Sequence, residues 1–317
     1  MSAQSAFSGP ALARRIAPNA LLLAIAVIMT VFALAEPAFL KVDNLIGIVR
    51  QVSLIGIMAA STTFVIMTGG VDLSVGPVLA LSGLTSYYCL ELGTPLPIVI
   101  LAGLSTGALV GLANGLTIAF LQLPPIIVTL SMLSIVRGSA LILGGPEQHL
   151  IRGEPAYTFI GAGNLLGLPF PIYVFASVAA AMILLQRRTT FGLLVAAIGD
   201  NERAAALSGH RTRITKTVVY VISGLGAAVA GIVQSSQVHT ALATYGPFGT
   251  ELDVIAAVVV GGTSIMGGNG SVARTLLGVF FLGVMNDGMN ILNVSIDIQL
   301  MAKGAIIVGA LAVAARR

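Results

Sequence analysis

The amino-acid sequence predicts an all-α polytopic membrane protein, and two observations carry this prediction. Of the 317 residues, 56% are hydrophobic and only 9% are charged, with a mean hydropathy of +1.00. A soluble domain of this length would be about one quarter charged. Runs of roughly 17 to 25 apolar residues, which suffice to cross a bilayer as a helix, recur along the whole chain. The fold class is therefore a membrane bundle of about ten transmembrane helices.

The ten apolar runs follow one another with short polar connections. They cover Ala17–Ala35, Leu45–Thr68, Ser74–Leu92, Pro97–Leu121, Ile126–Leu143, Phe170–Leu185, Thr217–Ser235, Leu252–Ile265, Thr275–Leu292 and Ile298–Ala315. The runs that begin at Phe170 and Leu252 are short. Residues 1–16 are predicted to form an N-terminal tail, and residues 17–317 a single transmembrane domain. With ten spans, both chain ends lie on the same side of the membrane.

The distribution of basic residues predicts that this side is the cytoplasm. The loop 186–216 alone holds six of the sixteen basic residues, and cytoplasmic loops are enriched in arginine and lysine. Arg50, Arg137 and Lys303 fall within the runs, near the outer ends, where long side chains can snorkel to water. Glu251 is placed on the outer side. The net charge of +4 therefore reflects topology and does not indicate nucleic-acid binding.

The residues that carry catalysis or bind metals in other proteins are scarce here. Cys89 is the single cysteine, which excludes an internal disulfide and a cysteine-based metal cluster. His149, His210 and His239 lie in three different loops. We expect no metal, no cofactor and no catalytic site. The first apolar run follows Arg14 without a convincing cleavage site and is expected to be retained.

The loop 186–216 is predicted to contain two short helices. Phe191 to Ile198 is apolar enough for the first, and Gly199 is expected to break it. Asn201 with Glu202 can cap a second helix that ends at Leu207, and Gly209 closes it. Such a loop presents a firm surface to a soluble partner. The alternative is a folded connector without a function of its own.

Two glycine-interrupted segments occur in corresponding positions of the two halves. At Gly69 and Gly70 the second run ends, Asp72 or Ser74 can cap the next helix, and Pro77 suits its first turn. In the second half, residues 261–271 repeat this design. Broken helices in two pseudo-repeat halves indicate a transport path between them. An ordinary cytoplasmic turn with a capping aspartate is the alternative for the first segment.

Two helical stripes complete the pattern. Gly103, Gly107, Gly111 and Gly115 share one face of the fourth run, where another backbone can approach closely. Asn114 lies beside this stripe, and an interhelical hydrogen bond is favoured there over a ligand contact.

The ninth run carries asparagines on what is predicted to be a single helical face. Asn286, Asn290 and Asn293 are spaced by four and three residues, with Asp287 alongside. Polar groups inside a span must face protein or a water-filled cavity. A hydrogen-bonded structural stripe and a substrate-facing surface both remain open.

Three motifs resemble the ribose-type, branched-chain-like permease family of bacterial ABC importers. They are TGGVDLSVG at 68–76, TFGLLVAAIGDNERAAALSG at 190–209 and GGTSIMGGNGS at 261–271. The resemblance covers residues 45–312. Leu193 departs from the family pattern, in which arginine is common.

This resemblance implies a permease subunit of an importer for a monosaccharide or related polyol in the bacterial inner membrane. The implied partners are a cytoplasmic ABC ATPase, a periplasmic sugar-binding protein, a second permease chain, identical or homologous, and membrane lipid. No G-x-x-x-x-G-K-[ST] motif occurs in the chain, so ATP is expected to bind elsewhere. ATPase coupling is expected from Phe191, Gly192, Gly199, Asn201, Glu202, Ala204 and Gly209. The substrate pathway is expected to include Gly69, Gly70, Asp72, Ser74, Asn114, Asn286 and Asn290.

Two other classes of protein remain as alternatives. An ion-coupled carrier would need no ATPase and would use Asp72 or Asp287 as its coupling carboxylate. An intramembrane enzyme would need convergent catalytic groups, and the scattered carboxylates and histidines do not supply them.

Overall fold

A computed structural model describes residues 20–247 and 249–314, so the predicted tail at 1–16 lies outside the described residues. The helices, in chain order, are α2 (Ala20–Ala35), the short 3-10 helix η1 (Pro37–Leu40), α3 (Val42–Met67), α4 (Val75–Glu91), α5 (Leu96–Phe120), α6 (Pro125–Gly144), α7 (Pro155–Ala162), α8 (Phe170–Arg188), α9 (Thr190–Leu207), α10 (Thr212–Val238), α11 (Thr250–Val260), α12 (Val272–Ile291) and α13 (Ile296–Ala314).

Strands are confined to two short antiparallel pairs in the described part of the chain. β1 (His149–Leu150) pairs with β4 (Thr240–Ala241), and β2 (Asn164–Leu165) pairs with β3 (Leu168–Pro169). The first pair ties the connection after α6 to the segment that follows α10.

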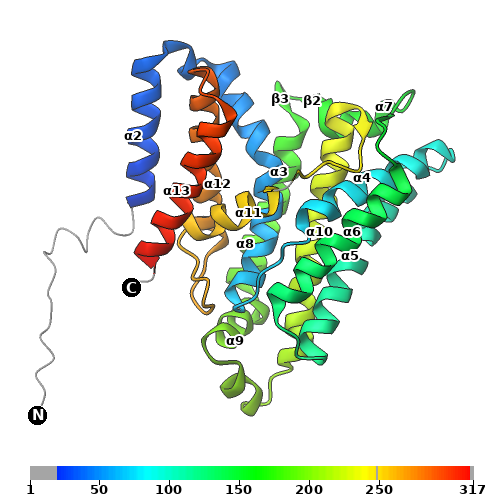
Figure 1. The fold of residues 1–317 in the computed structure, drawn as a ribbon, viewed down its shortest axis with the longest axis vertical. Coiled ribbons are helices and arrows are strands. Elements are labelled where there is room, and N and C mark those ends of the chain that lie inside the picture. The colour runs from blue at the N-terminus through cyan, green and yellow to red at the C-terminus, as the bar shows by residue number, and fades with distance from the viewer. Residues whose placement is uncertain (1–19, 248, 315–317) are drawn as a thin grey trace, which may run out of the picture.

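The helices form one bundle with two sides (Figure 1). α2, α12 and α13 lie on one side, and α4, α5, α6 and α10 lie on the other. α3 runs between them and packs against α8, α10, α11 and α12. α9 closes one end of the bundle, and α7 lies at the opposite end.

Six described helices are long and apolar enough to cross a membrane, namely α3, α5, α6, α8, α10 and α12. Each of the ten predicted runs contains one helix, which confirms a multi-span helical fold without establishing ten spans. The predicted span Leu252–Ile265 is wrong, because α11 ends at Val260 after 11 residues. At about 1.5 Å per residue, that helix rises roughly 16 Å, about half of the hydrocarbon thickness.

The glycine stripe of α5 is the closest helix contact and confirms the packing prediction. A β-carbon on Gly107 would overlap the carbonyl oxygen of Gly224, and one on Gly111 would overlap that of Tyr220. A β-carbon on Gly115 would lie 2.6 Å from the α-carbon of Thr217. All three partners belong to α10. α5 and α10 therefore touch backbone to backbone along most of their length.

Candidate functional site: a glycine junction under two broken helices

The chain between α3 and α4 is non-helical over residues 68–74, a segment we call the first break. Gly69 has a φ of +76°, which an L side chain rarely adopts. At Gly70, a β-carbon would lie 2.5 Å from the Tyr220 hydroxyl. The carbonyl of Val71 accepts a hydrogen bond from Thr129 on α6 at 3.2 Å. The first break is therefore fitted tightly between α6 and α10.

Asp72 holds the first break against α10. Its side chain is 1% exposed. One carboxyl oxygen accepts hydrogen bonds from the Ser74 amide at 3.0 Å and the Ser74 hydroxyl at 2.6 Å. The other accepts from the Ser223 hydroxyl on α10 at 2.8 Å. Ser223 in turn lies 3.1 Å from the hydroxyl of Thr62 on α3.

Asn114 extends this network to α5. Its side-chain amide donates to the Ser74 hydroxyl at 2.9 Å, so the predicted interhelical hydrogen bond is confirmed. Its own carbonyl oxygen is buried without a hydrogen-bond partner among the described residues. Ser74 is the residue before α4, but its side chain makes no capping hydrogen bond to the helix. The Asp72 carboxylate accepts from the amide of Ser74, which lies just before the helix begins. The network thus joins α3, α5 and α10 to the start of α4.

The three sequence motifs meet where α9 touches the end of α3 and the turn 261–271, which in turn touches Gly69. A β-carbon on Gly199 would overlap the Met67 carbonyl oxygen and the Gly268 amide nitrogen. The Gly268 amide donates to that same Met67 carbonyl at 2.9 Å. A β-carbon on Gly267 would lie 3.0 Å from the Gly69 amide nitrogen. We call this contact of Met67, Gly69, Gly199, Gly267 and Gly268 the glycine junction.

The position of the break within α9 differs from the sequence prediction. Gly199 stays helical, and the non-helical residue is Asn201, with φ −160° and ψ 96°. The Asn201 side chain accepts a hydrogen bond from the Ala204 amide at 2.9 Å, so its predicted capping role is confirmed. Gly199 does not break the helix, because its lack of a side chain serves the packing against Met67 and Gly268.

The other predicted coupling residues divide into buried anchors and an exposed surface. The ring of Phe191 packs against Phe64 of α3, with ring centroids 5.7 Å apart. Gly192 is buried, and a β-carbon there would overlap the Gln186 carbonyl oxygen. Ala204 is exposed, and Gly209 ends the loop helix with a φ of +84°. Leu193 is 73% exposed, a large apolar side chain on the free face of α9.

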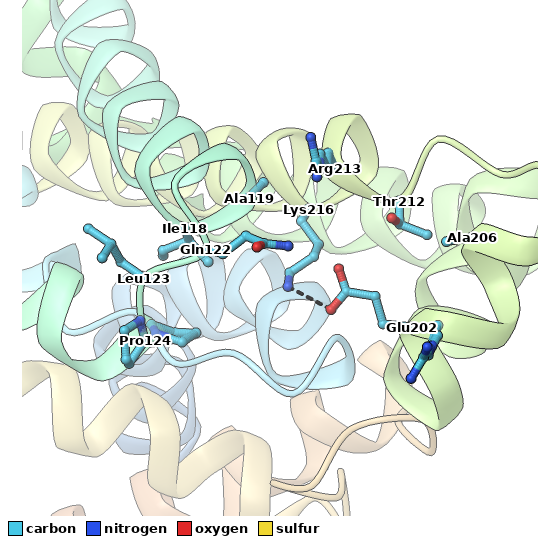
Figure 2. A pocket seen from close by; sticks show the side chains of 12 residues that line it. Ile118, Ala119, Gln122, Leu123, Pro124, Glu202, Ala206, Thr212, Arg213 and Lys216 are labelled. Carbon is cyan, nitrogen blue, oxygen red and sulfur yellow. Dashed lines mark hydrogen bonds and ion pairs between the residues drawn. The ribbon is translucent and has the colours of Figure 1, made fainter.

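A cavity of about 550 Å³ lies beside the second part of α9 (Figure 2). It is lined by the turn between α5 and α6 and by the start of α10. Three basic side chains line this cavity, those of Arg203, Arg213 and Lys216, and one carboxylate, that of Glu202. Glu202 pairs with Lys216 at 2.9 Å. The α9 end of the bundle therefore presents excess positive charge next to the glycine junction.

A second cavity, of about 390 Å³, contains charged residues that the sequence reasoning misplaced. Arg137 of α6 donates to the carbonyls of Ala243 and Tyr245 at 2.6 and 2.8 Å, and to that of Gly246. It does not snorkel to the membrane surface. Glu251, predicted on the outer side, is 3% exposed and lies against the first turn of α4. Lys303 was also predicted to snorkel, and its ammonium group instead forms an ion pair with Asp253 at 3.1 Å.

The asparagine face of α12 is shorter than predicted. Helix α12 ends at Ile291, and Asn293 adopts a left-handed φ of 54° beyond it, so Asn293 does not share the face. Asn290 is exposed and accepts from the Gln299 amide at 2.8 Å. Asn286 is half-buried, and its carbonyl oxygen has no hydrogen-bond partner among the described residues. No described hydrogen bond links Asn286 or Asn290 to the Asp72 network.

At the α7 end, the chain between α6 and α8 is anchored on α10. Tyr157 is fully buried and its hydroxyl lies 2.7 Å from that of Ser235. Burial raises the pKa of Tyr157 to about 12, so the phenol stays protonated at neutral pH. Among the described residues, no group of three or more histidine, cysteine or acidic side chains could hold a metal ion.

Comparison with known proteins decides the family. Residues 44–311 match the model of the branched-chain amino acid transport system / permease component family. The chain belongs to this permease family. It is thus a multi-pass membrane transport component and not an enzyme, as the motifs predicted. No solved structure matches the chain significantly.

Several curated relatives resemble the permease over most of their length. The ribose import permease protein RbsC of Bacillus subtilis is 37% identical over 283 residues, which cover 89% of this chain and 87% of the relative. The L-arabinose transport system permease protein AraH of Escherichia coli is 36% identical, covering 92% and 88%. The galactofuranose transporter permease protein YtfT of Escherichia coli is 35% identical, covering 93% and 89%.

Proposed function

We propose that the permease is the membrane-spanning subunit of an ATP-driven importer for a monosaccharide or a related polyol. The three relatives named above carry pentose or hexose substrates in their names, and the chain aligns with each over most of its length. The chain has no phosphate-binding loop of its own, so a separate ABC ATPase hydrolyses ATP.

The observation that carries this proposal is the glycine junction. α9 lies at one end of the bundle, and through Gly199 it touches the end of α3 and the turn 261–271, which in turn touches the first break at Gly69. A partner that pushes on α9 therefore moves both glycine-rich segments together, because the backbones are in direct contact and no side chain lies between them. The exposed residues Leu193, Ala204 and Leu207 offer the docking surface, and the positive cavity beside them suits an acidic face of the ATPase.

The remaining partners and the topology are proposed from the family and from the distribution of basic residues. The α9 end faces the cytoplasm, where loop 186–216 concentrates basic residues, and both chain ends lie on that side of the bacterial inner membrane. The chain between α6 and α8, at the other end, faces a periplasmic sugar-binding protein. A second permease chain, identical or homologous, completes the path. Exposed apolar side chains such as Leu34 and Ile142 face lipid or that second chain.

The two halves of the bundle are proposed to be structural repeats. In each half a helix, α3 or α11, ends at a glycine-interrupted segment, 68–74 or 261–271, and a second helix, α4 or α12, follows it. The two segments touch, because a β-carbon on Gly69 would lie 3.5 Å from the Met266 carbonyl oxygen. Corresponding broken helices that meet inside a bundle are the pattern of transporters that alternate access around a fixed site.

The substrate path is proposed to run along the first break. Gly69, Gly70, Asp72, Ser74 and Asn114 form its rigid wall, because the two glycines lie close to neighbouring atoms and the three polar side chains are bonded within the Asp72 network. Asn286 and Asn290 face the path from α12 and offer both donors and acceptors to sugar hydroxyls.

Purification of the permease with the products of a candidate ATPase gene tests the class. The complex should hydrolyse ATP faster when a sugar-loaded binding protein is added, and should take up that sugar into proteoliposomes. Uptake that needs an ion gradient and no ATPase would favour the ion-coupled carrier and contradict the proposal.

A further inference from the structure

We propose that Arg137 and Glu251 form a recognition site for the hydroxyl groups of a neutral sugar, in a cavity that α4, α6 and the segment before α11 line. This inference rests on the proposed transport function and deepens it. Arg137 belongs to α6 and Glu251 to the first turn of α11, and both line the cavity of about 390 Å³.

Glu251 has one carboxyl oxygen that the fold leaves without a partner. The side chain is 3% exposed. One oxygen accepts from the Gly249 amide at 3.2 Å, and the other has no hydrogen-bond partner among the described residues. A β-carbon on Gly76 would lie 2.8 Å from this second oxygen. This oxygen is enclosed against Gly76, so a ligand in the neighbouring cavity reaches it only when α4 and α11 move apart. A buried, unpartnered carboxyl oxygen destabilises a fold, and its retention here points to such a ligand.

The guanidinium of Arg137 is held in place by hydrogen bonds to backbone carbonyls. It donates to the carbonyls of Ala243, Tyr245 and Gly246, in the non-helical segment between α10 and α11. No described ion pair joins Arg137 to Glu251, although both line one cavity. The two charged groups therefore face the same space without neutralising each other through direct contact.

The chemistry of this pair selects an uncharged, hydroxyl-rich solute. A carboxylate only accepts hydrogen bonds and a guanidinium only donates them, whereas a hydroxyl does both. A sugar can thus satisfy both groups at once. An anion would be attracted by Arg137 and repelled by Glu251, and a cation the reverse, so a single net charge gains at one group what it loses at the other.

The rest of the cavity fits the same ligand. Pro77, Leu133 and Pro247 supply apolar surface for the C–H faces of a sugar ring, and the exposed Thr244 supplies another hydroxyl. The volume lies within the range of about 300 to 1,000 Å³ typical of small-molecule sites. Helices α4 and α11 both begin beside Glu251, and their N-terminal dipoles stabilise its negative charge.

Protection of a reporter cysteine tests the site in the assembled transporter. In a Cys89→Ala background, Thr244→Cys places the single thiol on the cavity wall. The complex with its ATPase is reconstituted in proteoliposomes and treated with a water-soluble thiol reagent, with D-ribose, L-arabinose or D-galactose present or absent. At least one of these sugars should slow the labelling, in at least one nucleotide state.

The variant Glu251→Gln should raise the sugar concentration needed for half protection by roughly tenfold or more, because a charged acceptor is lost. Asp253→Asn is the matched control. It removes the same charge two residues further along α11, where the carboxylate faces Lys303, and should leave protection unchanged. Glu251→Asp, which keeps the charge but withdraws it by one methylene, serves if Glu251→Gln does not fold.

The outcomes separate the site from the transport function. The site is overturned if sugars protect the Thr244→Cys thiol equally well with glutamine and with glutamate at position 251. It is also overturned if the Thr244→Cys thiol reacts with the reagent in no nucleotide state. Uptake of a sugar that never protects Thr244→Cys also overturns the site but leaves the importer intact. A complex that takes up no sugar at all would overturn the proposed function instead.

Discussion

Replacement of Asp72 by alanine should destabilise the permease by about 1 to 3 kcal/mol. The carboxyl group accepts hydrogen bonds from the Ser74 amide, the Ser74 hydroxyl and the Ser223 hydroxyl. After its removal the Ser223 hydroxyl can turn to Thr62, 3.1 Å away, and the Ser74 hydroxyl keeps its bond from Asn114. The Ser74 amide has no such substitute, and one buried unsatisfied donor costs about that amount.

Asparagine at the same position should keep the network nearly intact. Its carbonyl oxygen can accept from the Ser74 amide and hydroxyl, and its amide can donate to Ser223. The Ser223 hydroxyl then donates to Thr62. Asp72→Asn should therefore lower the free energy of unfolding by less than about 1 kcal/mol and leave substantial sugar uptake.

Denaturation of the purified protein in detergent, together with uptake at matched protein levels, measures both variants. Asp287→Asn serves as the parallel variant, because Asp287 is the other carboxylate that an ion-coupled carrier would use. It accepts from Asn44 at 2.9 Å and lies on α12. Loss of uptake in Asp72→Asn at normal stability would refute the structural role and revive ion coupling.

Three further outcomes follow from the contacts of single residues. Gly199→Ala should lower uptake and stimulated ATP hydrolysis together, because the added methyl overlaps Met67 and Gly268 at an overpacking cost of about 1 to 3 kcal/mol. Gly47→Ala is the control, because a methyl there meets no neighbouring atom, and it should change neither uptake nor hydrolysis. Asn290→Ala should slow uptake by roughly two- to tenfold without abolishing it, and unreactive cysteines at 286 and 290 in every nucleotide state would contradict the path. Lys216→Met should change the free energy of unfolding by less than about 1 kcal/mol in chemical denaturation, since its partner Glu202 is 47% exposed.

Sequence reasoning located the helices because apolar runs and glycine spacing are local properties. The α5 stripe was predictable, since a four-residue period leaves one face bare whatever packs there. The exact end of α11 was not, because the apolar run continues to Ile265 while the helix stops at Val260. The glycine pair at 261–262 marks the break. It was assigned to a glycine-interrupted segment, but the predicted span was still extended across it to Ile265.

Residues whose roles depend on distant partners could not be assigned from the sequence. Gly199 can equally end a helix or admit a close neighbour, and only Met67 and Gly268 decide between the two. Arg137 was expected to snorkel from its apolar run to the membrane surface, and Glu251 was placed in a connection on the outer side. Their shared cavity depends on α6 and α11 meeting in space, and no local pattern records that contact.

Helix α11 links the glycine junction to the proposed sugar site. Glu251 lies in its first turn, and its last turn leads into Gly261 and the segment that holds Gly267 and Gly268. Eleven residues of hydrogen-bonded helix, roughly 16 Å long, move as a rigid rod. A shift of α9 at Gly199 therefore reaches the Glu251 carboxylate through the non-helical residues 261–268 and then along the helix. It follows that Gly199→Ala should alter sugar protection at Thr244→Cys as well as ATP hydrolysis, and protection that stays unchanged while hydrolysis falls would break this link.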